Sequence, residues 1–127
     1  MSDLNVTIIQ SDIHWESIHK NLEMFSEKIN SISESTDLIV LPEMFTTGFS
    51  MNPEKLAQPI SGETLEWMRE MAAKKSSIIT GSFICKEHNK YYNRLVWMNS
   101  DGNYEVYDKR HLFRMGEENN HYTSGNK

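Results

Sequence analysis

Four consecutive aliphatic residues, Leu38-Ile39-Val40-Leu41, constrain the fold of this chain more than any other feature of its sequence. The run does not alternate with polar residues, which is typical of a strand buried on both faces in an α/β sheet. Pro42 ends the strand, because proline cannot donate a hydrogen bond to a neighbouring strand. The sequence therefore predicts a short strand inside a sheet that is covered by further layers.

A second strand and a long helix precede this run. Residues 4–9 are apolar and rich in β-branched side chains, which favours a strand. Between residues 15 and 32 the apolar side chains recur at spacings of 3, 4, 3, 4 and 3, which is the pattern of one face of an amphipathic helix. Strand, helix and strand together predict a βαβ unit with a right-handed crossover between parallel strands.

The remainder of the chain predicts one further helix, three strands and two irregular segments. Apolar spacing favours a helix over residues 65–72, ending near residues 74–75, after an irregular loop over residues 44–62. Strands are expected at residues 77–85, 91–98 and 104–108, with a hairpin turn at 99–103 and a polar loop over residues 110–127. Since the sequence has neither an internal repeat nor a linker, we expect a single α/β or α+β unit.

Composition excludes several classes of function. The 127 residues carry 18 acidic and 13 basic side chains, a net charge of −5, which excludes a chain-wide basic surface for nucleic acids. No apolar run is long enough to cross a membrane, and the N-terminus lacks the pattern of a signal peptide, so we expect a cytoplasmic protein. The single cysteine excludes a disulfide framework, and neither the histidines nor the glycines have the spacing of a metal or phosphate site. We therefore expect neither a cofactor nor a metal, and neither nucleic acid nor membrane as a partner.

Two charged residues stand directly after predicted strands, where the functional sites of α/β proteins gather. Glu43 could act as a general base, and Lys109 could stabilise an oxyanion. Charged residues that follow strands are usually solvated, so by spacing alone the solvated-loop interpretation of both is favoured over the functional one. The basic residues Lys109, Arg110 and Arg114 could bind a carboxylate or form a solvated surface. Cys85 lies in a predicted strand with no turn beside it, so we interpret it as a small buried residue rather than a nucleophile.

Two segments, Leu41–Met51 and Tyr107–Phe113, resemble motifs of the nitrilase, or carbon–nitrogen hydrolase, superfamily, and in particular of its omega-amidases of the YafV type. Gln10 and the Gly81-Ser82 step also fit that family, so the resemblance runs in order along the whole chain. It implies a four-layer α-β-β-α sandwich, usually a homodimer. It also implies hydrolysis of small-molecule amides through a Glu–Lys–Cys triad and a cysteine thioester.

The resemblance also implies roles for individual residues. By position in the motifs, Glu43 matches the general base and Lys109 matches the lysine that stabilises the tetrahedral oxyanion. Counting back from Gly125-Asn126, Glu118 matches a second glutamate that orients the lysine and the attacking water, with Glu117 as its rival.

The activity implied by the resemblance is that of an omega-amidase-like hydrolase. Such an enzyme cleaves the side-chain amide of small 2-oxo acids such as 2-oxoglutaramate, and we expect Phe45, Met51 and Arg114 to bind the substrate. The alternative is a catalytically inactive fragment, or a non-catalytic binding module, that keeps the N-terminal half of the fold. An unrelated α/β domain with accidental motifs is a third possibility.

The nucleophile of the family is a cysteine at a strand–elbow junction, and Cys85 does not stand in that motif. The resemblance places the nucleophile after Lys127. Residues 1–127 are therefore expected to be the N-terminal portion of a single carbon–nitrogen hydrolase domain, truncated before the nucleophile strand. We expect the chain alone not to hydrolyse amides, because acyl-enzyme chemistry needs a nucleophile.

Two structural expectations follow from this interpretation. Glu43 and Lys109 should follow neighbouring strands of one sheet, with their charged atoms about 3–6 Å apart. The two predicted helices can cover only one face of the sheet. Its other face should expose apolar side chains and make the isolated chain associate or aggregate.

Overall fold

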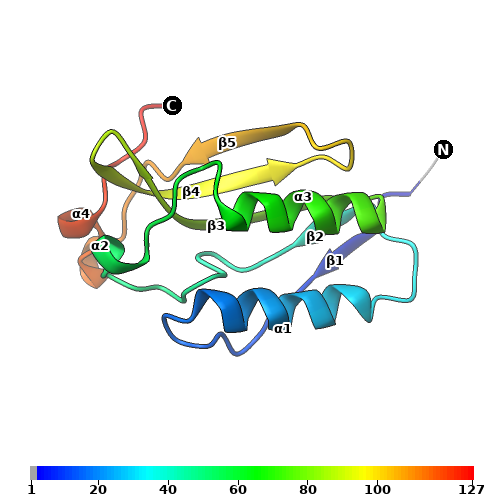
Figure 1. Cartoon of the computed structure of the whole chain (residues 1–127). Coiled ribbons are helices and arrows are strands. Elements are labelled where there is room, and N and C mark those ends of the chain that lie inside the picture. The colour runs from blue at the N-terminus through cyan, green and yellow to red at the C-terminus, as the bar shows by residue number, and fades with distance from the viewer. Residues whose placement is uncertain (1–2) are drawn as a thin grey trace.

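The computed structural model describes residues 3–127, in which five strands form one sheet beside two long helices (Figure 1). The strands are β1 (Val6–Ile8), β2 (Leu38–Val40), β3 (Ile78–Glu87), β4 (Lys90–Met98) and β5 (Tyr104–Asp108). The long helices are α1 (Ile18–Asn30) and α3 (Glu63–Lys75). The short ones are α2 (Pro53–Leu56), the 3₁₀ helix η1 (Arg114–Gly116) and α4 (Glu118–His121).

The strands stand in the sheet in the order of the chain, β1-β2-β3-β4-β5. The first three run parallel, and β4 and β5 each pair antiparallel with the strand before, so β5 points the same way as β2 and β3. The predicted βαβ unit is confirmed, with α1 between the parallel strands β1 and β2. The expectation that the strands before Glu43 and Lys109 are neighbours is wrong, because β3 and β4 lie between β2 and β5.

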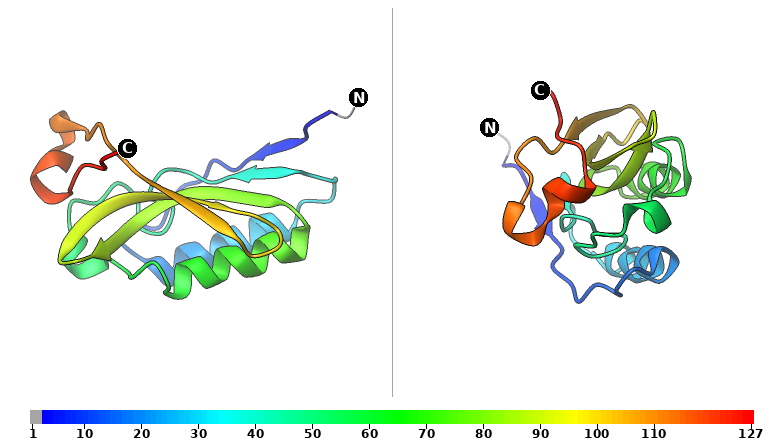
Figure 2. Two further views of the ribbon diagram at one scale, coloured as in Figure 1. Left: turned by 90° about the horizontal axis from the view of Figure 1, so that it is seen from above. Right: turned by 90° about the vertical axis from the view of Figure 1, so that its left-hand side faces the viewer.

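Both long helices lie on the same face of the sheet, as the view from above shows (Figure 2, left). Phe25 and Ile29 of α1 share one buried cluster with Met68 of α3 and with Ile79 and Phe83 of β3. The apolar spacing that predicts a helix over residues 15–32 therefore forms the core side of α1, although the helix is shorter at both ends. This layer of helix on sheet holds the main core.

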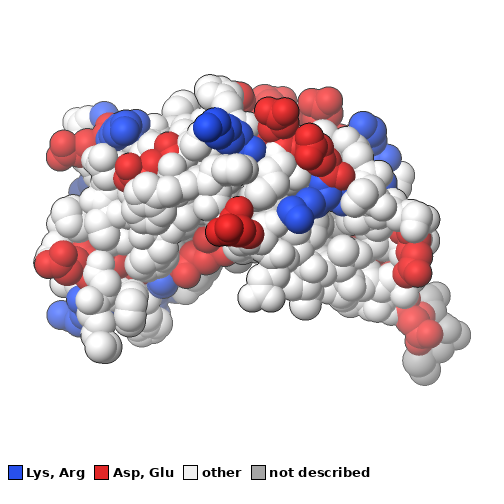
Figure 3. All heavy atoms as spheres, turned by 90° about the horizontal axis from the view of Figure 1, so that it is seen from below, with Lys and Arg blue, Asp and Glu red and all other residues white. Residues whose placement is uncertain are grey.

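Neither long helix lies on the opposite face of the sheet, where the short η1 and α4 lie at one end only (Figure 2, left). In β2 only Ile39, which faces the helices, is completely buried, and its two strand neighbours are half-buried. The expectation of burial on both faces is therefore wrong for the described residues. Leu95, Trp97 and Tyr107 are each more than a third exposed on this open face. Figure 3 shows it as a hollow along the lower edge, with mostly uncharged side chains.

Two segments that the sequence predicts to be irregular contain short helices. α2 lies within residues 44–62, and η1 and α4 lie within the polar tail. A single helical turn is unstable by itself, so contacts with the rest of the chain decide where it forms. In the tail, the buried hydroxyl of Tyr122 donates a hydrogen bond to the carbonyl oxygen of Ser50 at 2.6 Å.

None of the helices in residues 3–127 combines the length and apolar character needed to cross a membrane.

Candidate active site

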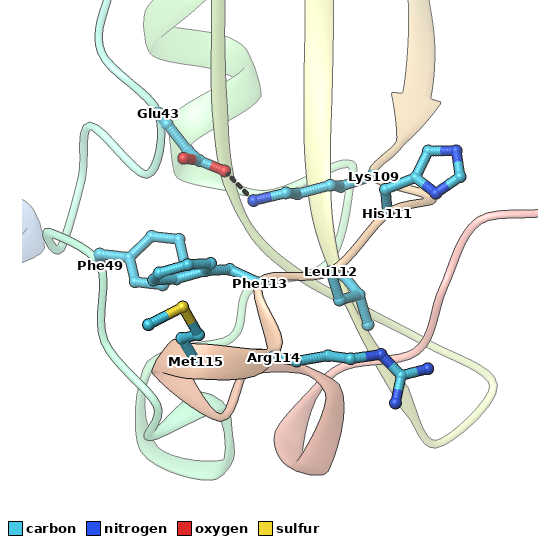
Figure 4. A pocket seen from close by; sticks show the side chains of 8 residues that line it. All are labelled: Glu43, Phe49, Lys109, His111, Leu112, Phe113, Arg114 and Met115. Carbon is cyan, nitrogen blue, oxygen red and sulfur yellow. Dashed lines mark hydrogen bonds and ion pairs between the residues drawn. The ribbon is translucent and has the colours of Figure 1, made fainter.

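Three charged side chains, which we refer to as the charged cluster, meet beyond the carboxyl ends of β2 and β5: Glu43, Lys109 and Glu118. The Lys109 Nζ atom lies 2.7 Å from Glu43 Oε2 and 3.0 Å from Glu118 Oε1. The side chain of Asn93, on β4, donates hydrogen bonds to both carboxylates, at 2.8 Å to Glu43 and 3.1 Å to Glu118. Figure 4 shows Glu43 and Lys109 reaching toward one another from separate segments of the chain. The predicted contact between them is confirmed.

Hydrogen bonds to β3 bring Glu43 toward the middle of the sheet after β2 has ended. The Phe45 amide donates to the carbonyl oxygen of Ser82 at 3.1 Å, and the Met44 amide donates to the Ser82 hydroxyl at 2.9 Å. Met44 adopts a left-handed backbone conformation, with φ of 51°. This tight turn carries the glutamate toward Lys109, although their strands are not neighbours.

The other two members of the charged cluster come from the end of β5 and from the tail. The Lys109 amide continues the pairing of β5 with β4 by donating to the carbonyl oxygen of Asn93 at 2.9 Å. Glu118 begins α4, and its completely buried carboxylate accepts a hydrogen bond from the Phe113 amide at 2.7 Å. Glu117, the rival for the second glutamate, is exposed. The structure therefore brings Glu118, and not Glu117, to the cluster.

The charged cluster holds two carboxylates and one ammonium group. Burial by itself lowers the pKa of Lys109, but the hydrogen bonds to Glu43 and Glu118 outweigh it and hold the pKa above its ordinary value of 10.5. The lysine is therefore positively charged at neutral pH. Its Nζ atom also lies 5.2 Å from the centre of the Phe49 ring, within cation–π range. An ammonium group fixed in this way can stabilise negative charge that develops on a substrate.

A pocket of about 680 Å³ opens beside the charged cluster (Figure 4). Two aromatic rings form part of its wall, those of Phe49 and Phe113, whose centroids lie 6.2 Å apart in an edge-to-face arrangement. The full lining is Glu43, Phe49, Lys109, His111, Leu112, Phe113, Arg114 and Met115. A second hollow of about 280 Å³ on the open sheet face shares Glu43 and Lys109 with this pocket. The cluster is thus accessible from two adjoining spaces.

The three residues predicted to bind the substrate lie in different surroundings. Arg114 lines the pocket, and its role there stays a prediction. Phe45 does not line it, because its ring is completely buried, 5.7 Å from the centroids of both Phe25 and Trp67. Met51 packs against a separate buried cluster, which consists of Met44, Leu56, Ile84 and Tyr122. The structure gives Phe45 and Met51 packing roles.

Cys85 lies outside the charged cluster. It belongs to the core on the helix side of the sheet, and burial raises the pKa of its thiol. The Arg94 Nη1 atom lies 3.6 Å from Cys85 Sγ, and the same guanidinium pairs with Asp108 at 2.6 and 3.0 Å. A buried thiol with a raised pKa is a poor nucleophile. The interpretation of Cys85 as a small buried residue is confirmed.

Asn93 and the two aromatic residues of the pocket, Phe49 and Phe113, are not among the site residues predicted from the sequence. An asparagine inside a strand is unusual, and that was a usable signal for Asn93. The two phenylalanines stand inside the motif segments, but nothing in their spacing shows that they face one another. Within residues 3–127, no three His, Cys, Asp or Glu side chains are gathered so that they could hold a metal ion.

Comparisons with known proteins agree with this geometry. The profile of the carbon-nitrogen hydrolase family matches residues 5–126. The chain is 40% identical over 125 residues to the omega-amidase YafV of Yersinia enterocolitica and 26% identical over 125 residues to the 2-oxoglutaramate amidase of Bacillus subtilis. These alignments cover 98% and 96% of the chain but 48% of each relative, so the chain spans about half the length of the curated relatives it matches.

A solved structure gives the same result for the fold. The crystal structure of a CN-hydrolase superfamily protein from Xanthomonas campestris superposes with a TM-score of 0.95 at 36% sequence identity. The match covers 100% of this chain and 48% of that one. The α/β sheet, the match over residues 5–126 and the similarity of fold lead to one conclusion: the chain belongs to the carbon–nitrogen hydrolase family, within the nitrilase superfamily.

Proposed function

We propose that the protein is an omega-amidase-type hydrolase, which cleaves the side-chain amide of a small 2-oxo acid such as 2-oxoglutaramate. Residues 1–127 are then the N-terminal portion of one catalytic domain, and the nucleophilic cysteine comes from a segment outside them. The observation that carries the proposal is the contact of the Lys109 ammonium group with Glu43 and Glu118 beside the pocket, at 2.7 and 3.0 Å. The names of two relatives, an omega-amidase and a 2-oxoglutaramate amidase, support the substrate class.

In this mechanism Glu43 is the general base. Its Oε2 atom accepts hydrogen bonds from Lys109 and Asn93, which leaves Oε1 to take the proton of the cysteine thiol. The thiolate adds to the amide carbon, and the electron pair of the C=O bond moves onto the oxygen, where the Lys109 ammonium stabilises the charge. The tetrahedral intermediate then breaks its C–N bond, and Glu43 returns the proton to the departing ammonia.

The second half of the reaction reuses the same groups. Glu43 takes a proton from water, the resulting hydroxide adds to the thioester carbon, and Lys109 again stabilises the oxyanion. Breaking the C–S bond releases the acid and restores the thiolate, which recovers its proton from Glu43. Glu118 acts as a positioning residue, because its buried carboxylate holds the Lys109 ammonium at 3.0 Å. The route needs neither a metal nor a cofactor.

The lining of the pocket supports the proposal that the substrate is small and acidic. The Arg114 guanidinium can pair with the carboxylate of a 2-oxo acid, and the rings of Phe49 and Phe113 can pack on its short aliphatic part. We expect Arg114→Met to raise KM for 2-oxoglutaramate with little change in kcat, because this contact is made equally in the ground and transition states. Following the resemblance, we also propose that the full-length form is a cytoplasmic homodimer.

The test is the release of ammonia from 2-oxoglutaramate by two proteins. One is the 127-residue chain alone, and the other is a fusion enzyme of this chain with the C-terminal half of the Yersinia omega-amidase, the part that this chain does not cover. We expect turnover by the fusion enzyme and none by the chain alone. Glu43→Gln and Lys109→Met should each lower kcat of the fusion enzyme at least about 100-fold.

Two controls make the result decisive. Cys85→Ala in the fusion enzyme should leave kcat unchanged, because this thiol lies in the core and away from the charged cluster. Thermal unfolding of each variant shows whether a loss of activity reflects a loss of folded protein. A folded fusion enzyme that is inactive, or one whose activity survives Glu43→Gln, would refute the proposal and favour the alternative of a non-catalytic binding module.

A further inference from the structure

Asn93 contacts every member of the charged cluster. Its side-chain Nδ2 atom donates to Glu43 Oε2 at 2.8 Å and to Glu118 Oε2 at 3.1 Å. Its backbone carbonyl oxygen accepts a hydrogen bond from the Lys109 amide at 2.9 Å. The Nδ2 atom carries two hydrogens, so each carboxylate can receive one of them. Since Asn93 is only 2% exposed, its contacts are with the protein and not with solvent.

The chemistry of the side chain explains why this position holds an asparagine. The Asn93 Oδ1 atom is buried and has no hydrogen-bond partner within residues 3–127, an arrangement that destabilises a fold. A leucine of similar size would avoid this loss, but it has no donor. An aspartate has the same shape, but it would place a third carboxylate beside Glu43 and Glu118. The amide gives both carboxylates a donor without adding charge.

The position of the Glu43 carboxylate depends on Asn93 more than the position of the Glu118 carboxylate does. The Glu118 carboxylate is completely buried, and the Phe113 amide holds one of its oxygens at 2.7 Å. The Glu43 side chain is 46% exposed, and within residues 3–127 its carboxylate is bonded by Lys109 and Asn93 alone. A half-exposed carboxylate held by a single flexible lysine can rotate toward water. Asn93 provides the second fixed point that prevents this rotation.

We infer that Asn93 is a positioning residue of the proposed amidase centre, whose amide holds the Glu43 carboxylate against Lys109 and leaves Oε1 free for proton transfer. The catalytic consequence of this inference rests on the proposed function, whereas its geometry concerns the 127-residue chain itself. The two parts can therefore be tested separately. Asn93 acts through Glu43 and Lys109, because a side chain buried to this extent offers almost no surface to a substrate.

The geometry is tested by NMR titration of the Lys109 ammonium group in the 127-residue chain, with Asn93→Ala and Asn93→Leu as the variants. Contacts with two carboxylates hold the pKa of Lys109 above its ordinary value. If Asn93 fixes Glu43, its loss lets that carboxylate move into water, and the Lys109 titration midpoint falls by about half a unit or more. The other basic or titratable side chains that line the pocket, those of His111 and Arg114, are the same in every variant.

The matched control is Asn21→Leu. Asn21 is also completely buried, and its side chain makes three hydrogen bonds, two with His14 and one with Thr46, but none with the charged cluster. We expect the Lys109 midpoint to stay unchanged in this variant. Asn93→Ala only removes atoms, so the titration can be carried out with this variant if Asn93→Leu fails to fold. A midpoint that is unchanged or higher in a folded Asn93 variant would overturn the inference.

Kinetics of the fusion enzyme test the catalytic consequence. Asn93→Ala should lower kcat about 10- to 100-fold and leave KM within about twofold, because a misplaced base slows the chemical step and not binding. Asn21→Leu should leave both constants unchanged per folded molecule. An inactive parent fusion enzyme would refute the proposed function and leave the Lys109 titration to judge the geometry. An active one whose kcat is insensitive to Asn93→Ala would overturn the inference alone.

Discussion

Removing the lysine of the charged cluster should destabilise the chain far more than removing an ordinary surface lysine. In Lys109→Met the Glu118 carboxylate stays completely buried, but it loses the ammonium group 3.0 Å away. Deleting one partner of a buried ion pair costs about 3–5 kcal/mol, and we expect the lower end, about 3 kcal/mol, because Lys109 itself is 28% exposed. The exposed Lys74 is the control, and Lys74→Met should change the free energy of unfolding by less than about 0.5 kcal/mol.

The double variant separates a buried unpaired charge from general damage to packing. Glu118→Gln alone should cost about 2 kcal/mol, because its new N–H₂ group faces the donors of Lys109 and Asn93. When both residues are replaced, no buried charge is left without a partner. The loss should then be about 2 kcal/mol smaller than the sum of the two single losses.

The assay is urea unfolding of the 127-residue chain, followed by tryptophan fluorescence at several pH values. Pairing raises the pKa of Lys109 above 10.5, so its stabilising contribution is fully present below about pH 10 and is lost as the pH rises through the raised value. The difference in the free energy of unfolding between wild type and Lys109→Met should therefore narrow in that alkaline range. The reasoning would be refuted if the losses in free energy of unfolding of the two single variants added up in the double variant. A loss below about 1 kcal/mol for Lys109→Met would refute it as well.

Three further predictions concern other parts of the molecule. Burial raises the pKa of the Cys85 thiol, so a thiol reagent should label the native chain at least about 100-fold more slowly than the chain in urea; equal rates would contradict its place in the core. Asp108→Asn should cost about 2–4 kcal/mol in urea unfolding, because it leaves the 4% exposed Arg94 with only its longer ion pair, to Glu87 at 3.3 Å. Glu66→Ala at a surface pair should cost less than about 1 kcal/mol. The open sheet face should make the isolated chain associate with rising concentration in sedimentation experiments and bind a hydrophobic dye; a monodisperse monomer that binds no dye would contradict this expectation.

Local periodicity allowed a correct prediction of the elements that build the core. Phe25 and Ile29 lie in α1 at the spacing expected for one helix face, and Ile39 is the buried centre of the aliphatic strand. Both patterns are formed by residues close together in the chain, so they can be recognised in the sequence alone. The short helix that carries Glu118 has no such pattern, because its position depends on contacts such as that of Tyr122 with the distant Ser50.

The candidate site was only partly predictable, because its geometry depends on residues far apart in the chain. The motifs identified Glu43 and Lys109. They did not show that two strands, β3 and β4, separate the strand before Glu43 from the strand before Lys109. From the sequence, Phe45 is predicted to bind the substrate. In the structure its ring packs over Gly81, where an added Cβ atom would lie 2.9 Å from Phe45 Cδ1. Nothing in the sequence of either segment shows that this glycine makes room for that ring.

Each strand of the sheet pairs with the strand that precedes it in the chain, and this order allows the sheet to grow while the protein is being synthesised. β2 can join β1 before β3 has left the ribosome, and each later strand adds to an existing edge. The charged cluster cannot form in this stepwise manner, because Glu43 must wait for Lys109 and then for Glu118 near the end of the described chain. The ion pair of Lys109 with Glu118 therefore needs residues that follow the complete sheet in the chain, and a nascent chain that ends before Glu118 cannot form it.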